Sequence, residues 1–370
     1  MNDRKPTLPP DVTAADAEIR WTDSGRPFVR TPDERFDGLP DYPWEPQYVD
    51  VDGMRMHYVE AGDPDGEVVL CLHGQPDWSY LYRRMIPILA EAGLRVIAPD
   101  HLGFGRSDKP VQLDDYTYLQ HVAWIEEFMD RLDLQQITPI VQDWGSLIGL
   151  RCVGNRPDRF ARVVVANGNL PVLPEGFEPV GMPASLEPQD LDWPFTPETL
   201  EAVGGNGMML FEKWAHYALV GRDFMPSVGM AKSINREITD GELAAYDSPF
   251  PARIYMAGVR KFPSLVNTVG HAPTNEAARA ALDAFERPVL GMFGLQDFIF
   301  GDEATRNATR VAIAGAAGQP HKDYPDAGHF IQEDAGPELA ADIAEWIRAT
   351  PRSPARREGS DQWINQGRTT

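Results

Sequence analysis

Short apolar runs and longer amphipathic stretches alternate over two parts of the chain. Apolar, often β-branched residues fill 67–72, 95–98, 137–141, 161–167 and 288–293, a pattern typical of strands buried on both faces. Residues 48–59 alternate apolar and polar side chains around Asp52 and Gly53, which indicates a hairpin. Helical patterns occupy 79–92, 117–133 and 336–349. Strands that alternate with helices predict an α/β protein with a mostly parallel sheet covered on both sides.

The strand signals stop between 170 and 285, where Pro, Trp and Met residues accumulate. We interpret the segment 170–285 as a helical cap inserted between two parts of the core, 47–169 and 286–349. Residues 1–46 are rich in Pro, Asp and Arg and predict an irregular N-terminal arm. Residues 350–370 are polar and interrupted by proline, which predicts a tail.

Residues 141–145 have the layout of a nucleophile elbow, the sharp strand-to-helix turn that lifts one side chain above a sheet. Asp143 stands where serine is usual, so it is a candidate nucleophile. The apolar run before it and the helical pattern after it fit a strand, a turn and a helix. An aspartate that only caps a helix after a buried strand would give the same five residues.

Asp143, Asp297 and His329 each follow a predicted strand, in the order nucleophile, acid, base that α/β-hydrolases share. Because ligands bind at the carboxyl ends of parallel strands, we expect the three side chains to meet there. Asp297 would hold the imidazole in one tautomer and stabilise its charged form, and His329 would be the base. A lone loop histidine is more often an ordinary surface residue, and only the ordered set of three favours catalysis.

A carboxylate nucleophile determines the class of reaction. With an ordinary pKa near ~4 it is already ionised at pH 7, and it can displace a leaving group from carbon to form an alkyl ester. A histidine can then activate the water that hydrolyses this ester. The backbone N–H groups of Gln75 and Trp144 are placed to receive the oxyanion.

The leaving group needs its own hydrogen-bond donors. A halide suits an indole N–H, which donates and has no acceptor function to repel the anion. Trp144 is adjacent to Asp143, and Trp193 or Trp214 from the predicted cap could supply a second indole. An epoxide would instead leave a tethered alkoxide, for which tyrosine hydroxyls are suitable donors. Three tyrosines of the predicted cap keep epoxide hydrolysis open: Tyr217, Tyr246 and Tyr255.

The composition narrows the class of partner. The chain has 56 acidic against 34 basic residues, a formal net charge of −22, which disfavours nucleic acid, anionic membranes and anionic substrates. No run approaches the ~18 apolar residues of a membrane span, no apolar leader is visible, and no metal-ligand pattern stands out. We expect a cytoplasmic protein without metal or other cofactor, acting on a small molecule as a monomer or weak homo-oligomer.

At this point the sequence resembles the haloalkane dehalogenases, specifically the subfamily with two halide-binding tryptophans. The resemblance covers residues 47–348. Its most specific parts are the Trp-Ser-Tyr-Leu-Tyr-Arg run within 73–83 and the Arg-Lys-Phe-Pro segment within 258–263, and further matches lie at 103–110, 141–145 and 326–333.

The resemblance implies an α/β-hydrolase fold, with a mostly parallel eight-stranded sheet flanked by helices and an inserted helical cap. It implies that Asp143 is the nucleophile, His329 the base and Asp297 the charge-stabilising acid, with Trp144 and Trp214 as halide ligands. The partners would be a small neutral haloalkane, water and a halide ion. An apolar pocket would be lined by Leu147, Phe211, Phe262, Ile299 and Phe300.

The sequence also departs from the family pattern. Gln75 stands where Glu or Asn is usual, and although its amide can donate to a halide, it lacks the charge of Glu for positioning water. The segment 171–206 before Trp214 is long and could gate access to the site. A non-catalytic ligand receptor on the same scaffold is a third interpretation, which the intact Asp143, His329 and Asp297 disfavour.

Overall fold

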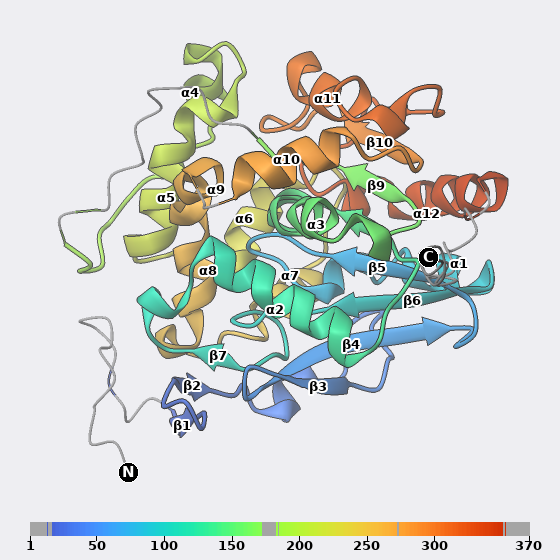
Figure 1. The fold of residues 1–370 in the computed structure, drawn as a ribbon. Coiled ribbons are helices and arrows are strands. Elements are labelled where there is room, and N and C mark those ends of the chain that lie inside the picture. Colours follow the sequence, from blue (N-terminus) through green and yellow to red (C-terminus); the bar gives the residue numbers. More distant parts are fainter. Residues whose placement is uncertain are drawn as a thin grey trace, which may run out of the picture.

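A computed structural model describes residues 17–171, 185–271 and 274–350, and the single positions Thr13, Pro183 and Arg352. Its centre is an eight-stranded sheet in the order β11-β10-β9-β8-β5-β6-β4-β3 (Figure 1). The strands are β3 (Gln47–Val51), β4 (Met54–Gly62), β5 (Glu67–Leu72), β6 (Leu94–Pro99), β8 (Thr138–Val141), β9 (Val163–Ala166), β10 (Val289–Gly294) and β11 (Lys322–Tyr324). In this order, each pair of neighbouring strands from β11 to β6, including β5, is parallel. Strand β4 pairs antiparallel with β3 and β6. The predicted mostly parallel sheet is confirmed.

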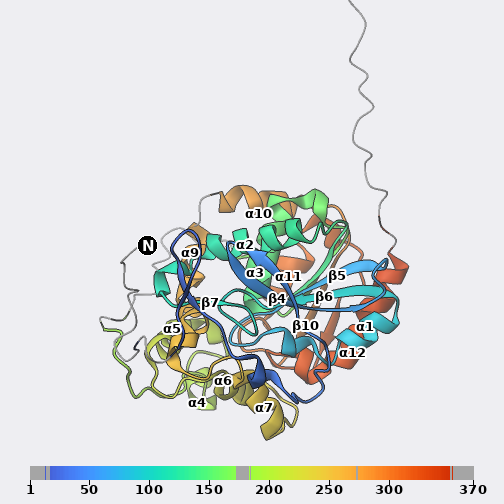
Figure 2. The same cartoon turned by 90° about the horizontal axis from the view of Figure 1, so that it is seen from below.

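Helices cover both faces of the sheet (Figure 2). α1 (Ile86–Glu91) and α12 (Ile331–Ala349) pack together on one face, in a buried cluster with Val69 and Val96. α2 (Tyr118–Arg131), α3 (Asp143–Asn155) and α10 (Asn275–Asp283) cover the other face, in a cluster with Leu70 and Ile97. Successive strand residues point to opposite faces, so strands buried on both sides have unbroken apolar runs.

The N-terminal arm is more regular than the sequence predicted. β1 (Arg20–Trp21) and β2 (Pro27–Val29) form a three-stranded sheet with β7 (Lys109–Pro110), and Phe28 and Val29 are buried. The prediction of an irregular arm is therefore wrong for residues 20–21 and 27–29. Strands of two or three residues are too short to display a period of two, so the hydrophobic pattern could not reveal them.

Between β9 and β10 every described element is a helix, and the helices before α10 lie beyond the carboxyl ends of the parallel strands (Figure 1). The α-helices before α10 are α4 (Pro197–Ala202), α5 (Phe211–Val220), α6 (Pro226–Ser233), α7 (Asp240–Asp247), α8 (Ala257–Lys261) and α9 (Val266–His271). α11 (Glu303–Arg310) follows β10, and the 3-10 helices are η2 (Asp33–Phe36), η3 (Ser79–Tyr82), η4 (Leu113–Asp115), η5 (Pro157–Arg159), η6 (Gly207–Leu210), η7 (Arg253–Met256), η8 (Phe262–Leu265) and η9 (Ala314–Ala316). Within the described ranges, no helix combines the length and the apolar character needed to cross a membrane.

α10 packs on α3, although it falls inside the segment 170–285 that the sequence assigned to the cap. The close approach requires a glycine, because a Cβ on Gly154 would lie 2.2 Å from the carbonyl oxygen of Ala278. α10 therefore belongs to the helix layer of the core. Below, the helical cap means the described residues 185–271.

Candidate active site

Asp143 lies at the turn between β8 and α3, with its backbone in the left-handed region at φ +46°. This conformation costs an L-residue on the order of 1 kcal/mol. Close packing requires glycines beside it, since a Cβ on Gly74 would lie 2.5 Å from the Asp143 carboxyl group, and one on Gly145 would lie 2.1 Å from the Leu72 carbonyl oxygen. The turn has the geometry of a nucleophile elbow, and it presents the carboxyl group to the cavity.

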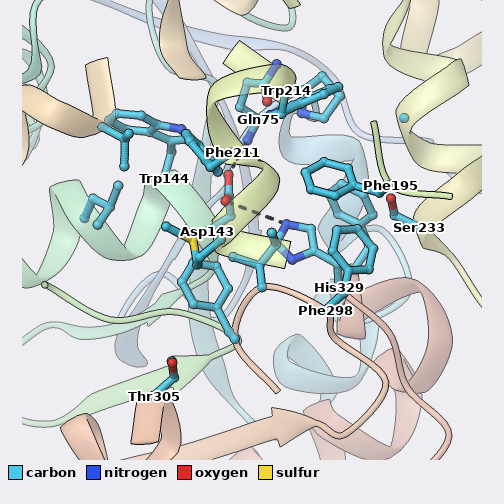
Figure 3. Close-up of a pocket in the computed structure, with 18 of the residues that line it drawn as sticks. Gln75, Asp143, Trp144, Phe195, Phe211, Trp214, Ser233, Phe298, Thr305 and His329 are labelled. Carbon is cyan, nitrogen blue, oxygen red and sulfur yellow. Dashed lines mark hydrogen bonds and ion pairs between the residues drawn. The ribbon is translucent and has the colours of Figure 1, made fainter. Parts of the chain in front are cut away.

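His329 lies between two carboxylates. Its Nδ1 is 3.1 Å from Asp297 Oδ2. Its Nε2 is 3.6 Å from Asp143 Oδ2, a contact that Figure 3 shows. His329 lies in the loop between β11 and α12, called the histidine loop below. Two side-chain amides fix this loop, because Asn167 Nδ2 and Gln142 Nε2 donate to the His329 carbonyl oxygen at 3.0 and 3.2 Å. The structure thus brings together the three side chains that the sequence placed at three separate strand ends.

The surroundings shift the pKa of both partners in this pair. Burial raises the pKa of Asp143 to about 6, against the opposing effects of the His329 charge and of the backbone N–H groups of Trp144 and Gln75. Burial alone would lower the pKa of His329, but the charges of Asp297, Asp143 and Asp77 outweigh it and raise the pKa to about 9. At pH 7 the pair is therefore a carboxylate beside an imidazolium.

Gln75 uses its backbone and its side chain for different partners. Its backbone N–H donates to Asp143 Oδ1 at 2.9 Å, and the Trp144 N–H acts on the same carboxyl group. Its side-chain Nε2 donates to the carbonyl oxygen of Val259 on α8 at 2.9 Å. The two backbone donors lie where an oxyanion would need them, whereas the side-chain amide connects the loop after β5 to the helical cap.

Three indoles border the same cavity as Asp143: Trp144, Trp193 and Trp214. The Trp193 N–H donates to the carbonyl oxygen of Phe195 at 3.1 Å. The N–H groups of Trp144 and Trp214 have no acceptor among the described residues, and both rings are largely buried. Two indole donors are therefore available to a ligand in the cavity.

An apolar cavity of about 250 Å³ adjoins Asp143. Four of the five predicted lining residues border it: Leu147, Phe211, Ile299 and Phe300. Phe262 does not, so its predicted place is corrected. Its ring is fully buried behind the cavity wall, 4.7 Å from the Trp144 ring and 4.6 Å from the Phe104 ring between centroids. An apolar residue in the wall and one packed behind it look alike in a sequence.

Three further aromatic residues of the wall were not predicted: Phe195, Phe298 and Phe330, which directly follows His329. Phe195 from the cap and Phe298 from the core border the cavity with ring centroids 4.7 Å apart. Phe298 directly follows Asp297, so its position next to the predicted acid was a signal. Phe195 belongs to an irregular segment, and nothing in the sequence marks it.

The cap tyrosines do not form part of the cavity wall that the structure describes. Tyr217, Tyr246 and Tyr255 are not among the described residues that border it, and the Tyr246 hydroxyl donates to Glu333 instead. In the part of the chain that the structure describes, no group of three or more His, Cys, Asp or Glu side chains could hold a metal ion.

Comparisons with known proteins agree with this geometry. A family model described as the alpha/beta hydrolase fold matches residues 67–199. The structure resembles that of a haloalkane dehalogenase from Paraglaciecola agarilytica NO2, described as tetrameric, with a TM-score of 0.69 and 30% identity over 87% of this chain and 98% of that chain. A putative ancestral haloalkane dehalogenase gives a TM-score of 0.61 and 26% identity, over 82% of this chain and 99% of that one.

Relatives in sequence are more similar still. A haloalkane dehalogenase of Mycolicibacterium paratuberculosis is 42% identical over 329 residues, which cover 87% of this chain and 98% of the relative. One of Mycobacterium marinum is 43% identical over 326 residues, which cover 86% of this chain and 99% of the relative. On this extent of similarity, the chain belongs to the haloalkane dehalogenase family and has its α/β-hydrolase fold.

Proposed function

We propose that the protein hydrolyses small neutral haloalkanes to an alcohol and a halide ion, through an alkyl ester on Asp143. One arrangement carries the proposal: the Asp143 carboxylate, the His329 imidazole and two indole N–H groups border a single apolar cavity. The two N–H groups belong to Trp144 and Trp214, and neither has an acceptor among the described residues. An apolar cavity accepts an uncharged alkyl chain and strengthens the few polar interactions within it.

The first step forms the ester and releases the halide. Asp143 Oδ1 already accepts the Gln75 N–H, so Oδ2 is the oxygen available to attack carbon. The new bond joins Oδ2 to the substrate carbon while the carbon–halogen bond breaks on the opposite side, and the bonding electrons leave with the halide. The indole N–H groups of Trp144 and Trp214 would receive this anion, each supplying a charge-assisted hydrogen bond.

The second step hydrolyses the ester. His329 Nε2 takes a proton from a water molecule whose oxygen adds to the Asp143 carboxyl carbon. Negative charge then develops on Oδ1, where the N–H groups of Gln75 and Trp144 stabilise it. When the tetrahedral intermediate collapses, the bond between the Asp143 carboxyl carbon and Oδ2 breaks. Oδ2 leaves with the alkyl group and takes the proton from His329, which gives the alcohol. The water oxygen stays in the carboxyl group, which loses the second water proton and is again a carboxylate.

Ester formation itself prepares the base. In the free enzyme, the Asp143 charge is one of the causes that raise the pKa of His329 to about 9. The ester carries no charge, so this contribution disappears and the pKa of His329 falls. The imidazolium can then lose its proton and act as the base, while Asp297 still orients Nδ1 from 3.1 Å.

The alternative functions have less support. Epoxide hydrolysis would need a hydroxyl donor above Asp143, and none of the three cap tyrosines considered for that role borders the cavity. A receptor without catalysis would have no need of His329 held between Asp143 and Asp297. We propose a haloalkane, water and a halide ion as the partners of this site, and a monomer or weak homo-oligomer as the assembly.

The direct test is bromide release from 1-bromobutane and 1-bromohexane by the purified protein, with styrene oxide as the competing epoxide substrate. We expect bromide and the corresponding alcohol in equal amounts, and no diol from the epoxide. Diol formation without bromide release would favour epoxide hydrolysis, and binding without any product would favour the receptor.

The first step is expected to fail in acid. Below its pKa of about 6, Asp143 is protonated and is no longer a nucleophile, so the single-turnover rate of bromide release should be about tenfold lower at pH 5 than on its plateau. Rapid-quench measurement between pH 5 and pH 8 checks this. A rate that is flat down to pH 4.5 would mean that the attacking group is not a carboxyl group with a raised pKa.

Trp214→Phe is expected to weaken halide binding while keeping an aromatic ring in the wall. Loss of one hydrogen bond to an anion costs about 1.5–3 kcal/mol, so the bromide affinity should fall about tenfold or more. Quenching of indole fluorescence by bromide measures the affinity. Trp193→Phe is the matched control, because the Trp193 N–H is already bonded to Phe195. A larger loss in Trp193→Phe would exchange the proposed roles of the two indoles.

A further inference from the structure

One carboxylate connects the helical cap to the loop that carries His329. Asp334, in the first turn of α12, accepts the backbone N–H of Gly328 on Oδ2 at 2.8 Å. On Oδ1 it accepts the backbone N–H groups of Asn235 at 2.8 Å and Arg236 at 2.9 Å. Gly328 directly precedes His329, and residues 235 and 236 follow α6 of the cap. The two halves of the connection therefore meet at a single side chain.

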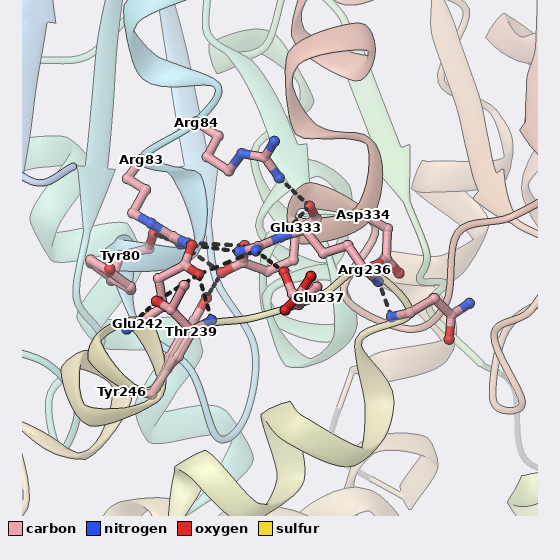
Figure 4. A network of polar contacts seen from close by, with 11 residues as sticks. Tyr80, Arg83, Arg84, Arg236, Glu237, Thr239, Glu242, Tyr246, Glu333 and Asp334 are labelled. Carbon is pink, nitrogen blue, oxygen red and sulfur yellow. Dashed lines mark hydrogen bonds and ion pairs between the residues drawn. The ribbon is translucent and has the colours of Figure 1, made fainter. Parts of the chain in front are cut away.

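A charged network fixes the same cap segment to the core beside Asp334 (Figure 4). Glu333 is fully buried and accepts Arg83 on both oxygens, at 2.6 and 3.1 Å, together with Arg236 and the Tyr246 hydroxyl. Glu242 of the cap accepts Arg83 at 2.6 Å and Arg236 at 2.7 Å. Two guanidinium groups thus face two carboxylates, so the network is balanced in charge. Because breaking a buried pair leaves an uncompensated charge, this network holds the cap segment in one position.

The two acidic neighbours have different partners. Glu333 contacts side chains, whereas Asp334 contacts three backbone N–H groups, two in the cap and one in the histidine loop. A second bond runs alongside, since the exposed Asn235 donates from Nδ2 to the Asp326 carbonyl oxygen at 3.0 Å. The network holds the cap on the core, and Asp334 connects the cap to Gly328, the residue before His329.

We propose that Asp334 is a positioning residue that couples the helical cap to the histidine loop and so keeps His329 at the Asp143 ester. The kinetic consequence rests on the proposed function. Asp143 is held separately by the elbow between β8 and α3, so the coupling acts on the base and on ester hydrolysis, not on the first displacement. A small displacement of a catalytic group from its reaction geometry slows the step it serves by an order of magnitude or more.

Asp334→Asn tests the coupling with little change of volume. Asparagine has one acceptor oxygen, so it can serve either the cap N–H groups or Gly328, and its NH2 group then faces donors on the other side. We expect ester hydrolysis about tenfold or more slower, with the first bromide release within about threefold of wild type. Hydrogen exchange should become faster at the amides of 235 and 236, of 328, or of both.

Two further variants complete the experiment. Glu338→Gln is the matched control on α12, because Glu338 is exposed and pairs with Lys322, away from the cap. Asn235→Ala removes only the bond to Asp326, and it should slow ester hydrolysis in the same sense by a smaller factor; it gives the answer if Asp334→Asn does not fold. Equal slowing of both steps, or faster exchange with ester hydrolysis unchanged, would overturn the proposal. If wild-type protein releases no bromide, the proposed function fails. Unchanged exchange at all three amides, 235, 236 and 328, in Asp334→Asn separately overturns the coupling.

Discussion

Replacement of His329 by glutamine is expected to leave one bromide ion released per protein molecule and a stable alkyl ester on Asp143. The displacement step needs only the ionised carboxylate, the halide donors and a bound substrate. None of these depends on the imidazole acting as a base. Hydrolysis of the ester does, because water is a weak nucleophile until a base removes its proton, and such a base contributes about 10²- to 10⁴-fold.

Two measurements distinguish this outcome from a general loss of activity. Intact mass should increase by the mass of one alkyl group less one hydrogen, and peptide mapping should place the increase on Asp143. Rapid-quench kinetics should show a burst of bromide close to one equivalent, followed by turnover reduced by about three orders of magnitude.

The removal of an imidazolium also changes the charge at the site. The positive charge of His329 opposes the rise in the pKa of Asp143, so the variant carboxyl group should titrate at a higher pH than in wild type. The burst should therefore be measured above pH 8. His321→Gln is a suitable control, because His321 bonds to Gly291 and Ala316 outside the cavity. A variant that shows neither a burst nor an adduct, yet binds bromide normally, would contradict the two-step mechanism.

Local patterns in the sequence were sufficient for the elbow and for the sheet. The run before Asp143 is apolar, the residues after it are helical, and Gly145 allows close packing, all within a few positions of one another. The meeting of Asp143, Asp297 and His329 followed from topology, since the carboxyl ends of parallel strands lie along one edge of the sheet.

Features that depend on contacts between distant segments could not be predicted in the same way. The Gln75 amide could have faced the cavity, and its bond to Val259 arises only once α8 has docked on the loop after β5. Phe262 has the composition of a wall residue, but packing against Trp144 and Phe104 puts it in the second layer. α10 is on the core because Gly154 lets it approach α3. In each case the partner lies more than 100 residues away.

Asp143→Asn is expected to abolish bromide release while leaving the cavity and its halide donors in place. Asparagine keeps an oxygen that can accept the Gln75 N–H, so the side chain can stay where it is, but it carries no negative charge to displace a halide. Loss of a nucleophile of this kind lowers turnover by about four to six orders of magnitude. No adduct should appear, in contrast to His329→Gln.

The same substitution should strengthen halide binding although it abolishes bromide release. These opposite effects on binding and on turnover make the variant informative. In the free enzyme a bromide ion between Trp144 and Trp214 would lie near a carboxylate, and at an effective dielectric constant near 20 two like charges about 5 Å apart repel by about 3 kcal/mol. Neutralising Asp143 removes that repulsion, so the bromide concentration that quenches the indole fluorescence should be at least about tenfold lower for Asp143→Asn than for wild type. Lowering the pH of the wild type through about 6 protonates the same carboxyl group and should shift its bromide affinity in the same direction. If bromide binds more weakly to the variant, the halide does not lie beside residue 143, and the two indoles are not its ligands.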